Sequence, residues 1–569
     1  MKKYCLQSIN HLKKNMKKSK VEIINLINSN KFNEAEKDLK TLLGLDPNNP
    51  DYNFFYGLVL AQKKNFAEAI IFFQKVRDEK EYRYDSNFNT ANCYQALGKS
   101  QNAIELFELC IIEFPTRHEP YQKLASCYQS ERKYEKAINL LNKSIEIQKT
   151  DYSYFLLGNI FREMGSFDLA LDSYRKSLKI NSNFLYSEIG ISKIFADLGE
   201  FQRALDNLIN LSNHNNTPLK IKIDAKIDIG NIYKSMGNYP KSIDCYKEVL
   251  GLDNKNPHAS YGMALSYLYQ KKYSLGWAFH ESRLSLSTFG VLRGRLKNFS
   301  KPLWNNNKPK KKLLIWGEQG IGESILYSQF TDVLLKEFEE ISLATDKKLV
   351  PFFKKIYPSI NIFNIEEIIN FKNYDHHLPM GSIGLYFQNQ ITYQLLKKKA
   401  SYPVRFNINK QQKLRCGISW ASGNKIFGHK KTIKLDLLKD IFLNEQIEFI
   451  NIQFNSNEKE ISKIEQDINT KIFINHDIDC YSDIDGVASL ISSCDFVITV
   501  SNSNAHISGK LGIKTFLLLP HSDGKLWYWG ENNDENILWY PSIRPIRQRK
   551  EGIWMDCISD LKKEIEKLL

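Results

Sequence analysis

The 569-residue sequence contains no apolar run that approaches the roughly 18 residues needed by a membrane-spanning helix. Its basic amino terminus, residues 1–20, is not followed by the apolar segment of a secretory signal peptide. The nine cysteines lie far apart and form no Cys-x-x-Cys pair, which argues against a disulfide framework and shows no zinc site. We therefore expect a cytoplasmic protein with reduced thiols and without an integral membrane segment.

Negative charge is in short supply, with 64 Asp and Glu against 79 Lys and Arg, a formal net charge of +15. The excess is mostly lysine scattered among Asn and Ile, and no basic stripe or nucleic-acid motif gathers it. We therefore expect no nucleic-acid partner. The rival interpretation, a basic repeat protein that binds nucleic acid, predicts an affinity that falls steeply with salt.

The first half of the chain repeats itself. Segments such as "NFAEAIIFF", "KYEKAINLL" and "NYPKSIDCY" align with one small residue in a fixed register, at steps of 33, 34 or 38 residues. A second small residue lies twelve positions upstream in all units but the first, which allows two helices of a unit to approach closely. The fixed small residues are Ala35, Ala69, Ala103, Ala137, Ala170, Ala204, Ser242 and Gly276.

This pattern resembles the tetratricopeptide repeat, whose period is about 34 residues. We expect seven to eight units over residues 21–285, stacked into an α-solenoid. The longest step includes "SNHNNTP" at 212–218, which predicts a longer loop between units. Such a solenoid offers a groove for a protein partner without naming one.

The second half alternates strands and helices. After a linker at 286–311, the apolar strand Lys312–Trp316 runs into "GEQGIGE" and then a helix from Ser324 to Phe338, the opening unit of a Rossmann-like lobe. The spacing of these glycines does not fit a dinucleotide fingerprint. A second series begins at Arg415. We expect an α/β region of two Rossmann-like lobes, 312–410 and 411–569, with a terminal helix that packs back across the first lobe.

The stretch "ITVSNSNAHISGKLG", residues 498–512, begins as an apolar strand, which is followed by four small polar residues and then by a predicted helix. Ser and Asn are common helix N-caps, which is the simpler interpretation. A strand-to-helix junction with free N–H groups can also be a phosphate-binding site. The residues alone leave both interpretations open.

Four segments in order resemble bacterial glycosyltransferases that carry N-terminal tetratricopeptide repeats, whose catalytic part is similar to the ADP-heptose:lipopolysaccharide heptosyltransferases. The join "GWAFHESRL" before the linker also fits. The segments are "KPLWNNNKPKKKLLIWGEQGIGESILYSQF", "GISWASGNKIFGHKKTIKL", "VITVSNSNAHISGKLGIKTFLLLP" and "LWYWGENNDENILWYPSIRPIRQ".

The resemblance implies a GT-B fold and metal-independent, inverting transfer of a hexosyl or heptosyl group from a nucleotide sugar, without a cofactor. It places the donor in the second lobe and the acceptor, a protein, glycan or lipid-linked saccharide, beside the first. Donor-binding candidates are Gly320, Gly322, Trp420, Lys425, Lys431, Gln453, Ser501, Asn502, Ser503, Asn504 and His506. For each lysine the alternative is a solvated loop charge, and for Trp420 it is a place in the core.

The acceptor hydroxyl needs a general base, and a carboxylate in a water-poor cleft is suitable. Glu323 stands where many relatives have Asp, and Glu318 is a weaker alternative. Glu323 could equally be an acidic first-turn residue favoured by the helix dipole. Ser501 also replaces a frequent Asp. These two departures favour a rival from another class, a catalytically inactive repeat scaffold that binds proteins.

Two "DID" sequences, at 477–479 and 483–485, could in another glycosyltransferase fold hold a metal and a diphosphate. Both precede a helix here, so acidic capping is the preferred interpretation and no metal site is predicted.

Overall fold

The computed structural model describes residues 20–286, 299–318, 320–397, 399–405, 413–423, 428–456, 458–521, 524–531 and 534–569. Of the predicted features, the basic segment before Lys20, residues 287–298 of the linker and the candidate Lys425 lie outside the described residues. The chain divides into two compact units, residues 1–198 and 199–569, which we describe separately.

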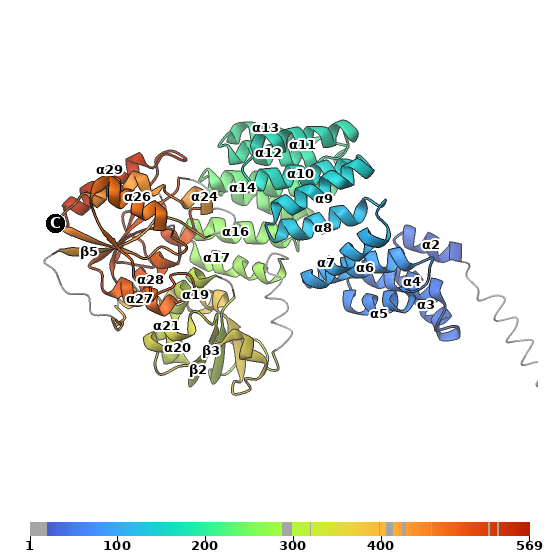
Figure 1. The fold of residues 1–569 in the computed structure, drawn as a ribbon. Helices are drawn as coiled ribbons and strands as arrows, with labels where there is room; N and C mark the ends of the chain where they lie inside the picture. The colour runs from blue at the N-terminus through green and yellow to red at the C-terminus, as the bar shows by residue number, and fades with distance from the viewer. Residues whose placement is uncertain are drawn as a thin grey trace, which may run out of the picture. The chain divides into compact units, whose positions relative to one another are not determined.

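The first unit consists of consecutive helices, each packed on its neighbours in the chain (Figure 1). Asn49 and Thr150 cap two of them by accepting hydrogen bonds from the backbone N–H groups of Tyr52 and Ser153. The helices are α2 (Lys20–Asn28), α3 (Phe32–Leu45), α4 (Pro50–Gln62), α5 (Phe66–Val76), α6 (Arg83–Ala96), α7 (Ser100–Glu113), α8 (Glu119–Ser130), α9 (Tyr134–Ile147), α10 (Asp151–Glu163), α11 (Phe167–Ile180) and α12 (Tyr186–Asp197).

The small residues of the repeat lie where helices touch, as predicted. A Cβ atom added at Gly57 would stand 2.7 Å from the ring of Phe73, and one at Gly158 would stand 2.5 Å from the ring of Tyr174. The alanines at the fixed small position, including Ala69 and Ala137, are fully buried. The predicted helical solenoid is confirmed.

The second unit begins with the remaining repeat helices, α13 (Phe201–Asn213), α14 (Leu219–Ser235), α15 (Tyr239–Leu252), α16 (Pro257–Tyr269), α17 (Tyr273–His280) and the 3-10 turn η1 (Glu281–Ser285). The predicted longer loop lies between α13 and α14. Residues 299–311, expected to be linker, instead join the first lobe: Trp304 is fully buried, and its backbone N–H donates to the carbonyl of His377.

The first lobe is built on a four-stranded parallel sheet in the order β3-β2-β1-β4. The single helix expected over 324–338 is divided into two α-helices, α19 and α20, by the 3-10 turn η3. The strands are β1 (Lys312–Trp316), β2 (Glu340–Thr345), β3 (Asn361–Asn364) and β4 (His376–Pro379). The helical segments are α19 (Ile321–Tyr327), η3 (Ser328–Phe330), α20 (Thr331–Glu337), α21 (Val350–Ile356), η4 (Ile365–Ile369), η5 (Met380–Ser382), α22 (Ile383–Phe387), η6 (Gln388–Gln390) and α23 (Tyr393–Leu396).

The second lobe has a six-stranded parallel sheet in the order β10-β9-β8-β5-β6-β7, which is the doubly wound order 3-2-1-4-5-6 when counted from its first strand. The strands are β5 (Leu414–Ser419), β6 (Ile447–Asn451), β7 (Ile472–Phe473), β8 (Phe496–Val500), β9 (Lys514–Leu519) and β10 (Ile543–Arg547). The helical segments are α24 (Gly428–Lys431), η7 (Leu435–Leu438), α25 (Lys439–Phe442), α26 (Glu458–Ile468), α27 (Ile484–Ser492), α28 (Ser503–Leu511), η8 (Trp527–Trp529) and α29 (Met555–Glu566).

Helices cover both faces of the second sheet, with α26 and α29 on one side and α27 and α28 on the other (Figure 1). Alternate residues of a strand point to opposite faces, so Phe496 and Ile498 enter one core while Val497 enters the other. The terminal helix α29 packs in the core of its own lobe through Ile558 and Leu561. The expectation that it crosses to the first lobe is therefore wrong.

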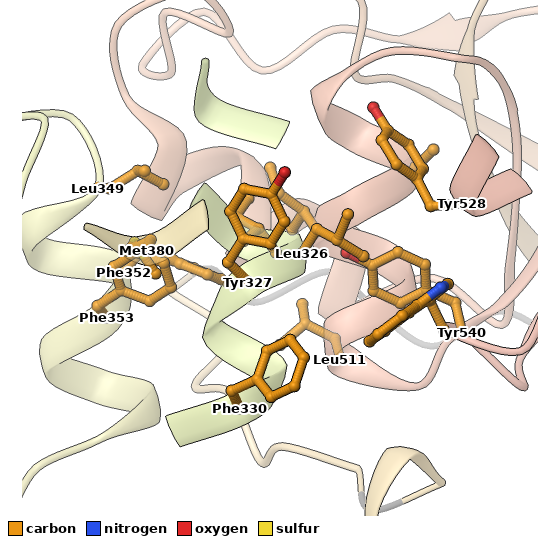
Figure 2. Close-up of a cluster of buried hydrophobic side chains, with 14 of the residues drawn as sticks. Leu326, Tyr327, Phe330, Leu349, Phe352, Phe353, Met380, Leu511, Tyr528 and Tyr540 are labelled. Atoms are coloured by element: carbon orange, nitrogen blue, oxygen red, sulfur yellow. The ribbon is translucent and has the colours of Figure 1, made fainter. Parts of the chain in front are cut away.

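One apolar core joins the two lobes and the last repeat. Figure 2 shows Tyr327 and Phe330 of the first lobe beside Leu511 and Tyr540 of the second, and Trp277 of α17 belongs to the same core. The C-terminal region is thus an α/β region of parallel sheets whose core includes side chains from the last repeat helices.

Candidate functional site

In doubly wound sheets ligands bind beyond the carboxyl ends of the two strands where the strand order reverses. In the second lobe these strands are β5 and β8, which pair in parallel. The side-chain amide of Asn502, after β8, donates to the hydroxyl of Ser419 at 2.8 Å and to the carbonyl of Ala421 at 3.1 Å, both at the end of β5. The quoted stretch therefore lies at this reversal point.

Its four polar residues have different roles. Asn502 is the N-cap of α28, because its side-chain oxygen accepts from the backbone N–H groups of Asn504 and Ala505. Asn504 is buried and donates to the carbonyl of Ile452 at 2.7 Å. The simpler interpretation, a helix cap, is confirmed. Ser503, the first residue of the helix, is partly exposed.

Ser501 connects this junction to a buried lysine. Its hydroxyl oxygen accepts from the ammonium of Lys431 at 3.3 Å and from the indole N–H of Trp529 at 3.0 Å. Lys431 is the last residue of α24 and is only 2% exposed. In the part of the chain that the structure describes, it forms no ion pair with a carboxylate. Burial lowers its pKa to about 8, although the negative charge of Glu323 acts in the opposite direction.

Glu323 lies in the first turn of α19 and is partly exposed. A Cβ atom added at Gly320, whose φ is +54°, would stand 2.1 Å from a Glu323 carboxylate oxygen. Burial raises the pKa of Glu323, its own backbone N–H and Lys431 lower it, and Glu318 raises it. The electrostatic interaction with Lys431 brings together the base candidate of one lobe and the cation candidate of the other.

The lobes meet where α19 passes α28. A Cβ atom at Gly322 would stand 2.6 Å from the imidazole ring of His506, so only glycine allows this approach. The Nδ1 atom of His506 is 2.9 Å from the hydroxyl of Tyr540. Burial and the charge of Lys431 lower the His506 pKa to about 3, which keeps the imidazole neutral. His506 therefore packs at the interface and adds no positive charge.

Two further candidates serve the fold. The side-chain oxygen of Gln453 accepts from the hydroxyl of Ser419 and from the backbone N–H groups of Trp420 and Ala421, which holds the loop after β5. The Trp420 side chain lies in the core of the second lobe and is 5% exposed. The core interpretation of Trp420 is confirmed, and the oxygen of Gln453 is occupied within the protein.

The second "DID" sequence contains a cap and an ion pair. Asp483 accepts from the backbone N–H of Gly486 at the start of α27, which confirms acidic capping there. Asp485 is buried and pairs with the ammonium of Lys355 at 2.7 Å and with the guanidinium of Arg405.

In the first lobe the strand order reverses between β1 and β4. Side chains of the protein occupy the region beyond the carboxyl ends of these two strands. Arg283, from the end of the repeats, forms a bidentate pair with Glu318, with N···O distances of 2.6 and 2.7 Å. A Glu318 oxygen also accepts from the backbone N–H of Gly381 at 2.6 Å. Glu318 is thus part of an ion pair and less suited to act as a base.

The sequence interpretation missed Arg283 and did not identify Trp529 as a partner of Ser501. Both stand in segments that carried the resemblance, "GWAFHESRL" and "LWYWG", but an unaligned sequence does not reveal their partners. The last repeat also places a tyrosine close enough to Glu323 for their charges to interact. Burial raises the pKa of Tyr261, on α16, to about 12; Arg283 has a smaller lowering effect, and Glu323 and Glu318 have smaller raising effects. The last repeat therefore contributes to the surroundings of Glu323.

Comparison with known proteins places the first half of the chain. Models of the tetratricopeptide repeat match residues 22–84, 85–117, 118–151, 152–184 and 230–271. The chain is a tetratricopeptide-repeat protein with an N-terminal solenoid. None of the described helices is long and apolar enough to cross a bilayer.

Two curated proteins similar to this repeat protein are Protein FlbA of Caulobacter vibrioides and BBSome complex member BBS4 of Bos taurus. The first is 24% identical over 309 residues, covering 49% of this chain and 50% of FlbA. The second is 23% identical over 222 residues, covering 39% of this chain and 42% of BBS4. The repeat protein thus spans about half the length of FlbA and less of BBS4.

Solved structures similar to the chain include a tetratricopeptide-repeat protein from Parabacteroides merdae, with a TM-score of 0.38 and 14% identity over 43% of this chain and 96% of that one. The Cut9–Hcn1 structure gives a TM-score of 0.34 and 17% identity over 47% of this chain and 52% of that one.

Proposed function

We propose that the repeat protein is a glycosyltransferase of the GT-B type. It moves a hexosyl or heptosyl group from a nucleotide sugar to an acceptor hydroxyl, without a metal and with inversion. The observation that supports this best is the buried Lys431 at the reversal point of the second sheet, where the described surroundings offer its ammonium a hydroxyl and no paired carboxylate.

A buried ammonium that forms no ion pair with a carboxylate is costly, and an anionic ligand would remove much of that cost. The start of α28 adds the positive end of a helix dipole, with Ser503 partly exposed at its first turn. Both features stabilise negative charge, which develops on a nucleoside diphosphate as it leaves the sugar. In the described part of the first lobe, the ion pair of Arg283 and Glu318 occupies the corresponding position beyond β1 and β4.

In this proposal Glu323 accepts the proton of the acceptor hydroxyl as the oxygen attacks the anomeric carbon. The bond between that carbon and the phosphate oxygen breaks, and the electron pair leaves with the nucleoside diphosphate, whose charge Lys431 balances. The raised pKa of Glu323 suits a general base, because the carboxylate is then more basic than one in water.

The repeats supply the second half of the proposal. Tetratricopeptide repeats are consistent with a protein-binding scaffold, and we propose that this solenoid binds the acceptor or a partner protein. The acceptor class is a protein, a glycan or a lipid-linked saccharide.

The test is a thermal-shift screen of UDP, ADP, GDP and CDP, followed by release of the nucleoside diphosphate from the matching nucleotide sugars. A bound ligand raises the melting temperature by mass action. Glu323→Gln should retain nucleotide binding and lose most donor turnover. Glu337→Gln, a surface carboxylate of the same lobe, is the matched control and should turn over like the wild type. A wild-type protein that binds none of these nucleotides would overturn the proposal.

A second candidate is a scaffold that binds proteins without catalysis. The helix cap formed by Asn502 favours it, because that cap already uses two N–H groups of α28. This candidate predicts nucleotide binding that is weak or absent and no donor turnover under any condition, with the repeats as the sole binding surface.

A further inference from the structure

The end of the last repeat carries an arginine that reaches into the first lobe. Arg283 is 1% exposed, and each N–H donor of its guanidinium has a partner. The partners lie in three segments: the end of the repeats, the loop after β1 and the turn after β4. The bonds run from Nε to Glu318 (2.7 Å), from Nη2 to Glu318 (2.6 Å) and Ser382 (2.9 Å), and from Nη1 to Glu281 (2.7 Å) and the carbonyl of His280 (3.3 Å).

The contact between the repeat and the lobe does not depend on this arginine alone. Ser382 donates to the carboxylate of Glu281 at 2.7 Å, so the repeat and the turn after β4 share a second bond. Trp277 of α17 is buried against α22, where a Cβ atom at Gly384 would stand 2.2 Å from its indole. The last helix of the solenoid is therefore packed against the first lobe.

The loop that Arg283 contacts leads directly into α19, the helix that carries Glu323. The loop 317–322 comprises residues 317–320, which connect β1 to α19, and the first two residues of α19, and Glu318 lies near its start. At its end the Glu323 carboxylate lies against Gly320. The ion pair thus fixes one end of a short glycine-rich segment, and Glu323 occupies the other end.

We propose that Arg283 is a positioning residue. Through Glu318 it anchors the end of β1 from which the chain continues into α19, and so helps to place Glu323 in the site, which makes the last repeat part of the transferase centre. That Glu323 is used as a base rests on the proposed function; that Arg283 holds the loop does not.

The physical reason lies in the geometry of the guanidinium. Its planar fork supplies five N–H donors, two of which bind the Glu318 carboxylate side by side, whereas the ammonium of lysine has three donors and no such fork. Without Arg283, Glu318 loses the guanidinium that binds both of its carboxylate oxygens. The loop then gains alternative conformations, and a misplacement of about 1 Å in a catalytic group costs about 100-fold in rate.

The experiment uses the full chain and two measurements. Hydrogen exchange followed by mass spectrometry reports on the loop 317–322 in the absence of any ligand. Nucleoside diphosphate affinity and donor turnover report on the site. The variants are Arg283→Lys and the double variant Arg283→Met with Glu318→Gln, which removes both charges and so leaves no lone buried one. Arg415→Lys, in a pair with Glu448 at the start of β5, is the matched control.

We expect faster exchange confined to the loop 317–322 and the turn 380–382 in both Arg283 variants, with unchanged exchange in the control. Turnover should fall about 100-fold at unchanged nucleoside diphosphate affinity, because the nucleotide seat lies in the other lobe. Two results would overturn the inference: loop exchange equal to that of the wild type in the double variant, or faster exchange throughout residues 199–569. If the wild type binds no nucleotide, the proposed function fails, and the exchange data still decide the role of Arg283.

Discussion

Replacing Lys431 by methionine should stabilise the ligand-free protein and abolish tight nucleotide binding. Burial lowers the Lys431 pKa from 10.5 to about 8, which corresponds to about 3 kcal/mol against the charged form in the folded protein. Methionine has a similar length and carries no charge to desolvate. This shift already includes the attraction between Lys431 and Glu323, so we expect a net gain of up to about 3 kcal/mol.

The same argument predicts how the free energy of unfolding changes with pH. Between pH 8 and 10.5 the unfolded chain still binds the Lys431 proton and the folded protein does not, so the free energy of unfolding rises with pH in that window. The stability advantage of Lys431→Met should be complete below pH 8 and disappear by about pH 10.5. Thermal unfolding of both proteins from pH 7 to 10.5, with and without nucleoside diphosphate, measures it.

Lys430→Met is the matched control, because Lys430 is the neighbouring lysine on α24 and lies 3.7 Å from the carboxylate of Glu551. It should give no stability gain and leave nucleotide binding largely intact. If Lys431→Met lowers the melting temperature at pH 7 and binds nucleoside diphosphate as the wild type does, the account of this lysine is wrong.

Three further predictions concern the same region. Gly322→Ala should lower stability by about 1–3 kcal/mol, because its Cβ would overlap the His506 ring; Gly251→Ala, with open space around it, should not, and equal melting temperatures would contradict the packing. Nucleoside diphosphate affinity of the wild type should fall up to about tenfold per pH unit above pH 8, as Lys431 loses its proton, whereas a flat calorimetric profile to pH 10 would exclude a role for its charge. Gly320→Ala should reduce donor turnover more than nucleotide affinity, because its Cβ displaces the Glu323 carboxylate; unchanged turnover would remove Glu323 from the reaction.

The sequence predicted the strands and helices whose pattern of apolar and polar residues indicates how they are buried. The β-branched run of β8 is buried on both faces, and such runs are readily identified as central parallel strands. The strand β10, "IRPIR", was missed because its Arg and Pro residues break the apolar pattern. Its place at the edge of the sheet explains why proline is tolerated there.

Individual residues of the candidate site could be predicted from the sequence, but the contacts between them could not. The sequence indicated Ser501 and Lys431 separately, but their contact joins residues 70 positions apart and depends on the strand order that places β5 beside β8. The same limit applies to Arg283, whose partner Glu318 is 35 positions away. Trp420 remained ambiguous because a tryptophan after a strand suits a core and a ligand equally well.

The most direct test of the central claim is a crystal structure of the full chain soaked with the nucleoside diphosphate that raises its melting temperature most. The account predicts the diphosphate beyond the carboxyl ends of β5 and β8, within about 3 Å of the Lys431 ammonium, a hydrogen-bonding distance. A nucleotide bound elsewhere, with Lys431 still bonded only to Ser501, would contradict it.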